Sequence, residues 1–144
     1  MENATRQSLM RRIVLDTNCL VAILPSKSVY HSVWTDFLEE RIEFCVSNEI
    51  LAEYEEIISI KTNHPFAEAI IKTLINKPNL LRVTPTWRFG LIEADPDDNK
   101  FVDCAICGGA ELIVSNDKHF NVLNETDFPF VRVQRLQDFI KEKQ

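Results

Sequence analysis

The sequence has few of the residues that soft-metal sites and basic nucleic-acid surfaces require. Its 144 residues include only three histidines, His31, His64 and His119, and no two of them have the spacing of a metal-ligand pair. A zinc centre built on histidine is therefore disfavoured, and we expect each histidine to be a packing or surface residue. The formal net charge of -6 argues against broad nucleic-acid binding through a basic face.

Long apolar runs are also missing. The longest are far shorter than the ~20 residues that cross a bilayer, and the opening MENATRQSLMRR is too polar for a signal peptide. We therefore expect a cytoplasmic protein with no membrane partner. A composition of 45% apolar and 26% charged residues fits a single domain. Residues 1–10 are predicted to be a flexible N-terminal extension, and residues 11–144 to form the domain.

Cysteine is present, but its pattern does not indicate a metal or redox site. All four cysteines lie inside apolar segments, as buried thiols do in a reducing compartment. Cys104 and Cys107 form a C-x-x-C in the middle of a predicted helix, whereas thioredoxin-like pairs open a helix after a strand. No second pair is present to complete a zinc site. We expect four structural thiols and no disulfide.

Short β-branched runs alternate with amphipathic segments along the chain, which is typical of strands and helices in turn. Strands are predicted at residues 11–16, 43–47, 80–85, 110–116 and 128–134. Helices are predicted at 18–24, 28–40, 49–61, 65–77, 98–107 and 135–143. Ser47 or Asn48 is expected to cap the third helix, and Gly108-Gly109 to close the fifth.

Strands separated by helices, with central strands apolar throughout, predict an α/β fold with a parallel sheet covered on both faces. We expect a three-layer α/β/α sandwich with five strands. Right-handed crossovers, together with the need to bring Asp16 beside Asp117, give the strand order 3-2-1-4-5. Functional sites in such folds lie beyond the carboxyl ends of the strands.

Acidic residues gather at that edge of the predicted sheet. Asp16 ends the first strand and Asp117 follows the fourth, while Asn18 and Ser115 bring neutral oxygens to the same place. At about 100° per residue, Glu53 falls beside the apolar stripe of its helix. A carboxylate turned toward a core is costly without a cation or hydrogen-bond donors, so Glu53 requires a partner.

The run DPDD supplies a fourth acid. Asp98 shares a helix face with Phe101, Val102 and Ala105, so its side chain is expected to point inward. Asp97 and Asn99 should face solvent or cap the helix, and Asp103 falls roughly 100° or more from the buried stripe. Helix capping accounts for one aspartate of this run, but not for four acids that converge on one sheet edge.

Four convergent carboxylates repel one another and raise each other's pKa unless a cation lies among them. Hard oxygen ligands suit Mg²⁺ or Mn²⁺, which bind through a few carboxylates and substrate phosphate oxygens. The chemistry that such a site favours is metal-assisted attack of water on a phosphodiester.

Several segments together resemble the PIN-domain family, particularly the VapC-type toxins of toxin–antitoxin pairs. They are VLDTNCLV, the glutamate in NEILAEYEEI, DPDDNKFVDCAICGGAELIVSND and FPFVRVQRLQDFI, and the match spans Arg11 to Ile140. The resemblance implies a ribonuclease that depends on Mg²⁺ or Mn²⁺ and cuts single-stranded RNA. It also implies that the acidic quartet and its supporting polar positions correspond to Asp16, Glu53, Asp98 and Asp117, and to Asn18 and Ser115.

The resemblance further implies partners. The first is the RNA substrate, for which Arg88, Lys100 and Lys118 are the best-placed basic residues near the strand ends. The second is a small antitoxin protein that covers the acidic site, and a homodimer is also considered. Trp87 and Phe89 lie in a polar loop, where they would form an exposed apolar patch or pack within the domain.

Other functions compete with this interpretation. A dehalogenase-like phosphatase requires a second aspartate two residues after Asp16, where Asn18 stands, and a receiver domain requires one at the end of the third strand, which is Thr84-Pro85. Both kinds of phosphoryl-transfer module are therefore disfavoured. A catalytically inactive PIN scaffold that binds RNA or protein remains an alternative, although such a scaffold would be expected to lose acids.

Overall fold

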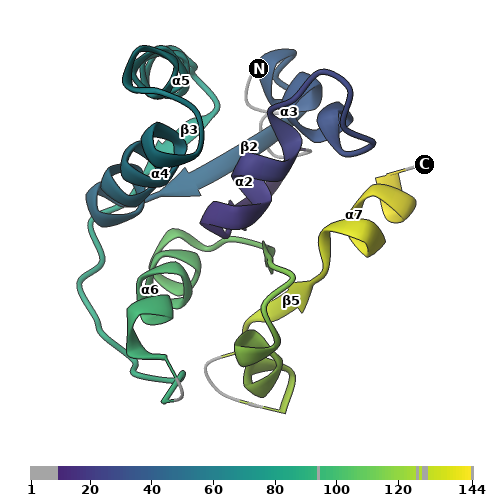
Figure 1. The fold of residues 1–144 in the computed structure, drawn as a ribbon. Coiled ribbons are helices and arrows are strands. Elements are labelled where there is room, and N and C mark those ends of the chain that lie inside the picture. The colour runs from purple at the N-terminus through teal and green to yellow at the C-terminus, as the bar shows by residue number, and fades with distance from the viewer. Residues whose placement is uncertain (1–9, 94, 126, 128–129, 144) are drawn as a thin grey trace, which may run out of the picture.

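The structure is a computed structural model that describes residues 10–93, 95–125, 127 and 130–143 (Figure 1). The flexible extension expected at residues 1–10 lies almost entirely outside these residues, so it stays a prediction. No helix among the described residues is long and apolar enough to span a bilayer.

A parallel sheet of five strands organises the fold, in the predicted order β3-β2-β1-β4-β5. The strands are β1 (Arg11–Leu15), β2 (Ile42–Val46), β3 (Leu80–Arg82), β4 (Leu112–Val114) and β5 (Arg132–Gln134). Leu15 pairs with Val114 at the carboxyl ends of the two central strands. The amide of Asp16 then donates to the Val114 carbonyl at 3.0 Å, which places Asp16 at the sheet edge beside the residues that follow β4.

Helices cover the sheet on both sides, as the sequence predicted. They are α2 (Thr17–Ile23), α3 (His31–Leu38), α4 (Asn48–Lys61), α5 (His64–Asn76), α6 (Asn99–Gly108) and α7 (Leu136–Lys143). Two 3-10 helices, η1 (Pro96–Asp98) and η2 (Lys118–Glu125), flank the sheet edge. In Figure 1, α6 lies on one side of the sheet and α2, α4 and α5 lie on the other.

Side-chain caps and one left-handed residue set the helix ends. The Ser47 hydroxyl accepts a hydrogen bond from the amide of Ile50, which confirms the expected cap of α4. Asn63 caps α5 in the same way through the amide of Phe66. Gly109 ends α6 with φ 66°, a backbone conformation that glycine adopts without steric cost.

Gly108 has a different role, because it allows α6 to approach the sheet closely. A Cβ atom at this position would collide with the Cys45 sulfur and lie 2.9 Å from Val83 Cγ2. Cys45 and Cys104 are both buried, with their sulfurs 3.7 Å apart. All four cysteines are free thiols in the structure; Cys19, Cys45 and Cys104 are buried, as expected of packing residues, whereas Cys107 is half-buried.

Candidate metal centre

Hydrogen bonds link the residues at the carboxyl ends of β1 and β4. The Ser115 hydroxyl donates to Asp16 Oδ2 at 2.8 Å and accepts from the amide of Asp117 at 3.0 Å. Asp117 Oδ1 in turn accepts from the amide of His119 at 2.9 Å. This chain of contacts fixes two of the predicted acids, Asp16 and Asp117, on either side of Ser115.

Asp16 is a buried carboxyl whose surroundings raise its pKa. Burial is the main cause, and the negative charges of Asp117 and Glu53 add to it. Hydrogen bonds from the Ser115 hydroxyl and the Thr17 amide oppose the shift. Asp117 and Glu53 therefore lie close enough to Asp16 for their charges to act on its carboxyl group.

Asp98 joins this group from the opposite side, at the junction of η1 and α6. Its side chain is only 15% exposed, as the helix-face argument predicted. Burial raises its pKa to about 6, and the charges of Asp95, Asp117 and Asp16 contribute, while His119 partly offsets them. Asp98 therefore faces Asp16 and Asp117 across the sheet edge.

Glu53, on α4, has the partners that its inward position required. Its Oε2 accepts a hydrogen bond from the hydroxyl of Thr17, the residue that follows Asp16. Its Oε1 lies 2.8 Å from the ammonium of Lys100, which is also 3.0 Å from Asp97 Oδ2. The Lys100 side chain is 10% exposed, so this lysine points into the acidic group.

The other predicted polar residues are more peripheral. Asn18 is exposed in the first turn of α2, and Lys118 is exposed at the start of η2. Arg88 is also exposed and pairs with Glu49 at 3.2 Å. Arg88 and Lys100 both line a cleft of about 250 Å³, whose acidic lining residues are Glu49, Asp97 and Asp103 rather than the four predicted acids. The exposed side of the site therefore carries positively charged side chains as well as carboxylates.

One expectation about the acidic run was wrong. Asn99 neither faces solvent nor caps the helix, because its side chain bonds to the amide and the carbonyl of Ile92 at 2.8 and 3.0 Å and holds the preceding loop. Asp103 lies off the apolar stripe but is buried, because the loop folds over it and the amide of Phe89 donates to its carboxylate at 3.0 Å.

The two aromatic residues of this loop differ in exposure. Trp87 is 69% exposed, whereas Phe89 is half-buried, so of these two only the tryptophan forms an exposed apolar surface.

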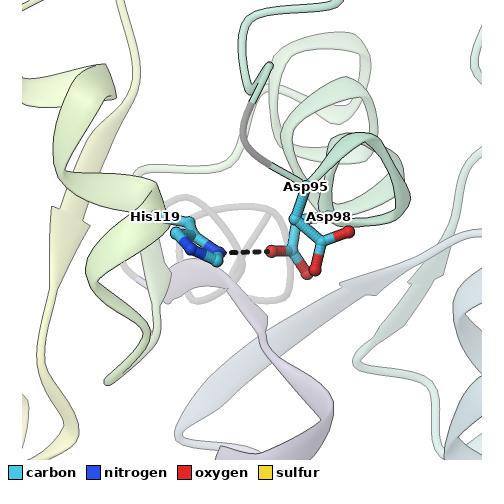
Figure 2. A group of neighbouring side chains, drawn as sticks. All are labelled: Asp95, Asp98 and His119. Atoms are coloured by element: carbon cyan, nitrogen blue, oxygen red, sulfur yellow. Dashed lines mark ion pairs between the residues drawn. The ribbon is translucent and has the colours of Figure 1, made fainter.

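Sequence reasoning missed two members of the site, Asp95 and His119. Figure 2 shows their side chains beside Asp98, and one ligand atom from each of the three lies within 4.8 Å of the others. His119 was not expected at the site because no second histidine has a metal-ligand spacing to it, but it lies two residues after Asp117 and so reaches the same edge. Asp95 lies one helical turn before Asp98 and so reaches the same edge as Asp98.

The residues present fit a divalent cation. Asp98 Oδ2 and His119 Nδ1 are buried, and neither has a hydrogen-bond partner among the described residues. Buried polar atoms ordinarily have hydrogen-bond partners, whereas these two atoms approach each other only at an ion-pair distance of 3.8 Å. Both atoms are therefore available as ligands of a cation. The carboxylate oxygens around them are donors that Mg²⁺ and Mn²⁺ accept.

Comparisons with solved structures give the same fold. The chain is similar to one in the VapBC2 complex of Rickettsia felis bound to a DNA fragment of its promoter, with a TM-score of 0.60 and 14% identity over 86% of this chain and 98% of that one. It is also similar to a chain in the DNA-bound VapBC complex of Salmonella typhimurium, with a TM-score of 0.55 and 19% identity over 88% of this chain and 99% of that one. No curated protein gives a match.

A family model places the chain more specifically. The model that describes the PIN domain matches residues 12–119, which is more than half of the sequence. The matched region contains β1 except for Arg11, β2 to β4, and all of the acids described above. This chain therefore belongs to the PIN-domain family.

Proposed function

We propose that the chain is a ribonuclease that depends on Mg²⁺ or Mn²⁺ and hydrolyses phosphodiester bonds in single-stranded RNA. One observation carries the proposal: the carboxylates of Asp16 and Asp117, at the ends of β1 and β4, lie close enough to Asp98 at the start of α6 for their charges to raise its pKa. Such repulsion is costly unless a cation relieves it. Membership of the PIN-domain family supports the same activity.

In this proposal Asp16, Asp98 and Asp117 hold the cation, and Glu53 reaches it from α4. A divalent cation bound there would activate water and stabilise negative charge on the phosphate. Ser115 orients Asp16 by donating to its Oδ2, and Asn18 stands at the exposed rim. The carboxylate of Glu53 is held by Thr17 and Lys100 until the site is loaded.

The basic residues around the site would bind the RNA backbone. Arg88 and Lys100 line the cleft, and Lys100 also contacts Glu53 of the acidic group. Lys118 is exposed at the start of η2. Phosphate contacts of this kind supply affinity without sequence information. Because the chain carries a net charge of -6, RNA binding would depend on these few residues and on the metal.

We also propose that the protein is the toxin of a toxin–antitoxin pair and acts in the cytoplasm. Two structures of similar fold are VapBC complexes bound to DNA, which supports a protein partner. Trp87, exposed in the loop between β3 and η1, offers such a partner an apolar contact. Co-purification with the product of a neighbouring small gene, and suppression of activity by it, would test this assignment.

The test of activity is cleavage of labelled RNA by the purified protein. A single-stranded RNA and its duplex should be incubated with Mg²⁺, with Mn²⁺ and with a chelator. We expect cleavage of the single strand only, in the presence of either cation, and cleavage about a hundredfold slower by Asp98→Asn. Asp138→Asn removes an exposed acid from α7 and is the matched control.

The same assay separates the alternatives. An inactive PIN scaffold would bind the RNA in a gel-shift assay without cutting it, and would have no need of the cation. A phosphatase-like module would hydrolyse a small phosphomonoester and leave the RNA chain intact. Either result would overturn the proposed nuclease activity.

A further inference from the structure

The position of His119 is determined by the same turn that presents Asp117. Its amide donates to Asp117 Oδ1 at 2.9 Å, and η2 begins one residue earlier. The imidazole then points toward Asp98, with Asp95 beside it (Figure 2). Nδ1 lies 3.4 Å from Asp117 Oδ1 and 3.8 Å from Asp98 Oδ2. The imidazole edge is therefore turned toward two of the proposed metal ligands.

These distances do not suit hydrogen bonds. An N–H to O bond is usually 2.7–3.2 Å long, and Nδ1 is a buried atom without a hydrogen-bond partner among the described residues. They do suit ligand atoms around one octahedral cation. With bonds of about 2.1 Å, adjacent ligand atoms lie about 3.0 Å apart and opposite ones about 4.2 Å apart. The separations of 3.4 and 3.8 Å from Nδ1 to the two carboxylates lie between these two values.

We propose that His119 is a nitrogen ligand of the divalent cation, and that it makes the site favour Mn²⁺ over Mg²⁺. Mg²⁺ takes oxygen ligands and gives up its water reluctantly, whereas transition-metal ions accept imidazole as well as carboxylate. Asp95 and Asp98 supply oxygens next to Nδ1, with ligand atoms no more than 4.8 Å apart. The inference deepens the proposed function and rests on its cation site.

A protonated imidazole that serves only as a counter-charge for the acids is the competing role for His119. This counter-charge role predicts that a divalent cation would displace the imidazole ring. It also predicts that loss of the ring would raise the affinities for Mn²⁺ and Mg²⁺ equally. A nitrogen ligand predicts instead a selective loss of Mn²⁺ affinity. The two roles therefore differ in the ratio of the Mn²⁺ and Mg²⁺ affinities.

Calorimetric titration of the whole chain with MnCl₂ and with MgCl₂ measures this ratio. We expect His119→Phe, which keeps a ring but has no ligand atom, to weaken Mn²⁺ binding by about tenfold or more. Mg²⁺ binding should be nearly unchanged. His119→Asp restores an oxygen ligand and should bring the two affinities closer together than in the parent. His64→Phe, at the exposed start of α5, is the matched control and should keep the parental ratio.

Pulsed electron paramagnetic resonance of the Mn²⁺-loaded protein gives a second readout that needs no substitution. We expect nitrogen coupling in the parent and in His64→Phe, and its loss in His119→Phe. Bound Mn²⁺ without nitrogen coupling, or an unchanged affinity ratio in His119→Phe, would overturn the inference and leave the proposed nuclease intact. Failure of the parent to bind either cation would overturn both.

Discussion

The Ser115 hydroxyl donates a hydrogen bond of 2.8 Å to Asp16 Oδ2, although 99 positions separate the two residues in the chain. Both side chains are buried where β1 and β4 end side by side. The same hydroxyl accepts from the amide of Asp117. Ser115 therefore fixes the relative positions of two acids that come from separate strands.

Ser115→Ala should weaken both metal binding and folding. Loss of the donor removes an effect that lowers the pKa of Asp16, so the buried carboxylate becomes more costly. It also leaves the Asp117 amide without its acceptor. We expect a loss of about 1–2 kcal/mol in the free energy of unfolding in urea, together with weaker Mn²⁺ binding by calorimetry. Ser115→Thr keeps the hydroxyl and should retain most of both, and an unchanged alanine variant would refute this role.

Gly108→Ala should destabilise the protein through the contact between α6 and the sheet. The added Cβ would collide with the Cys45 sulfur, which lies in the core and has little room to move. Overpacking of this kind costs about 1–3 kcal/mol, which urea unfolding measures directly. Metal affinity should fall only if the added atom also displaces the start of α6, where Asp98 lies.

A double variant tests whether that collision is the cause. Cys45→Ala removes the sulfur, so Gly108→Ala should cost less in the Cys45→Ala background than in the parent. Val83, 2.9 Å from the added atom, lies near the end of a short edge strand and has more freedom to adjust. Equal costs in the two backgrounds would show that backbone entropy or another contact dominates.

The inward position of Asp98 could be predicted because it follows from helical periodicity. The strand order could be predicted because periodicity locates the strands and crossovers between parallel strands are right-handed. Strand residues alternate between faces and helix residues recur every 3.6 positions, so a sequence states which side chains share a face. The need to bring Asp16 and Asp117 together then left one order of strands. The same logic required a partner for Glu53 without identifying it.

The residues that escaped prediction depend on contacts that no periodicity describes. Asp103 is buried because a loop without regular structure covers it through the amide of Phe89. Lys100 follows Asp98 by two positions, but its long flexible side chain reaches Glu53 on another helix. His119 belongs to η2, which buries Phe120 and Leu123, and that apolar pattern does not state what the neighbouring imidazole contacts. These placements come from tertiary packing, which local patterns do not contain.

Asp98→Asn should lower RNA cleavage without lowering the stability of the fold. Loss of one negative ligand should lower metal-dependent RNA cleavage by about a hundredfold, or roughly 3 kcal/mol of transition-state stabilisation. Asp97→Asn changes an exposed neighbour that pairs with Lys100, and should stay close to the parental rate. A dead Asp97→Asn beside an active Asp98→Asn would show that the assignment of the inward acid is wrong.

The stability of the same variant should depend on pH. The folded pKa of Asp98 is about 6, above the ordinary value of 3.8, so the folded state favours the protonated form. This contribution to stability is present below pH 3.8 and is lost as the pH rises through 6. In metal-free buffer, Asp98→Asn should therefore be more stable than the parent at pH 7 by about 1 kcal/mol, after allowance for solvent screening. Urea unfolding near pH 4 should show the two proteins converging, and an advantage that persists there would contradict the electrostatic cause.

Lys100 lies where it would both compete with the metal and assist the substrate. Burial lowers the pKa of its ammonium, but hydrogen bonds and charge interactions with Glu53 and Asp97 outweigh burial and raise the pKa overall, so Lys100 stays charged at neutral pH. A positive charge held 2.8 Å from Glu53 opposes the entry of a divalent cation. The same charge is well placed to contact a phosphate in the adjoining cleft.

Lys100→Gln should therefore change metal binding and RNA cleavage in opposite directions. Removal of the charge frees Glu53, so Mn²⁺ affinity measured by calorimetry should rise about fivefold, equivalent to roughly 1 kcal/mol. RNA cleavage at saturating Mn²⁺ should fall, because one phosphate contact is lost, and RNA binding should become less sensitive to salt. Lys118→Gln, on the exposed start of η2, removes a charge without touching Glu53 and should leave Mn²⁺ affinity unchanged. If Lys100→Gln instead weakened Mn²⁺ binding, the lysine would be a support that orients Glu53 for the metal, and the idea of competition would be wrong.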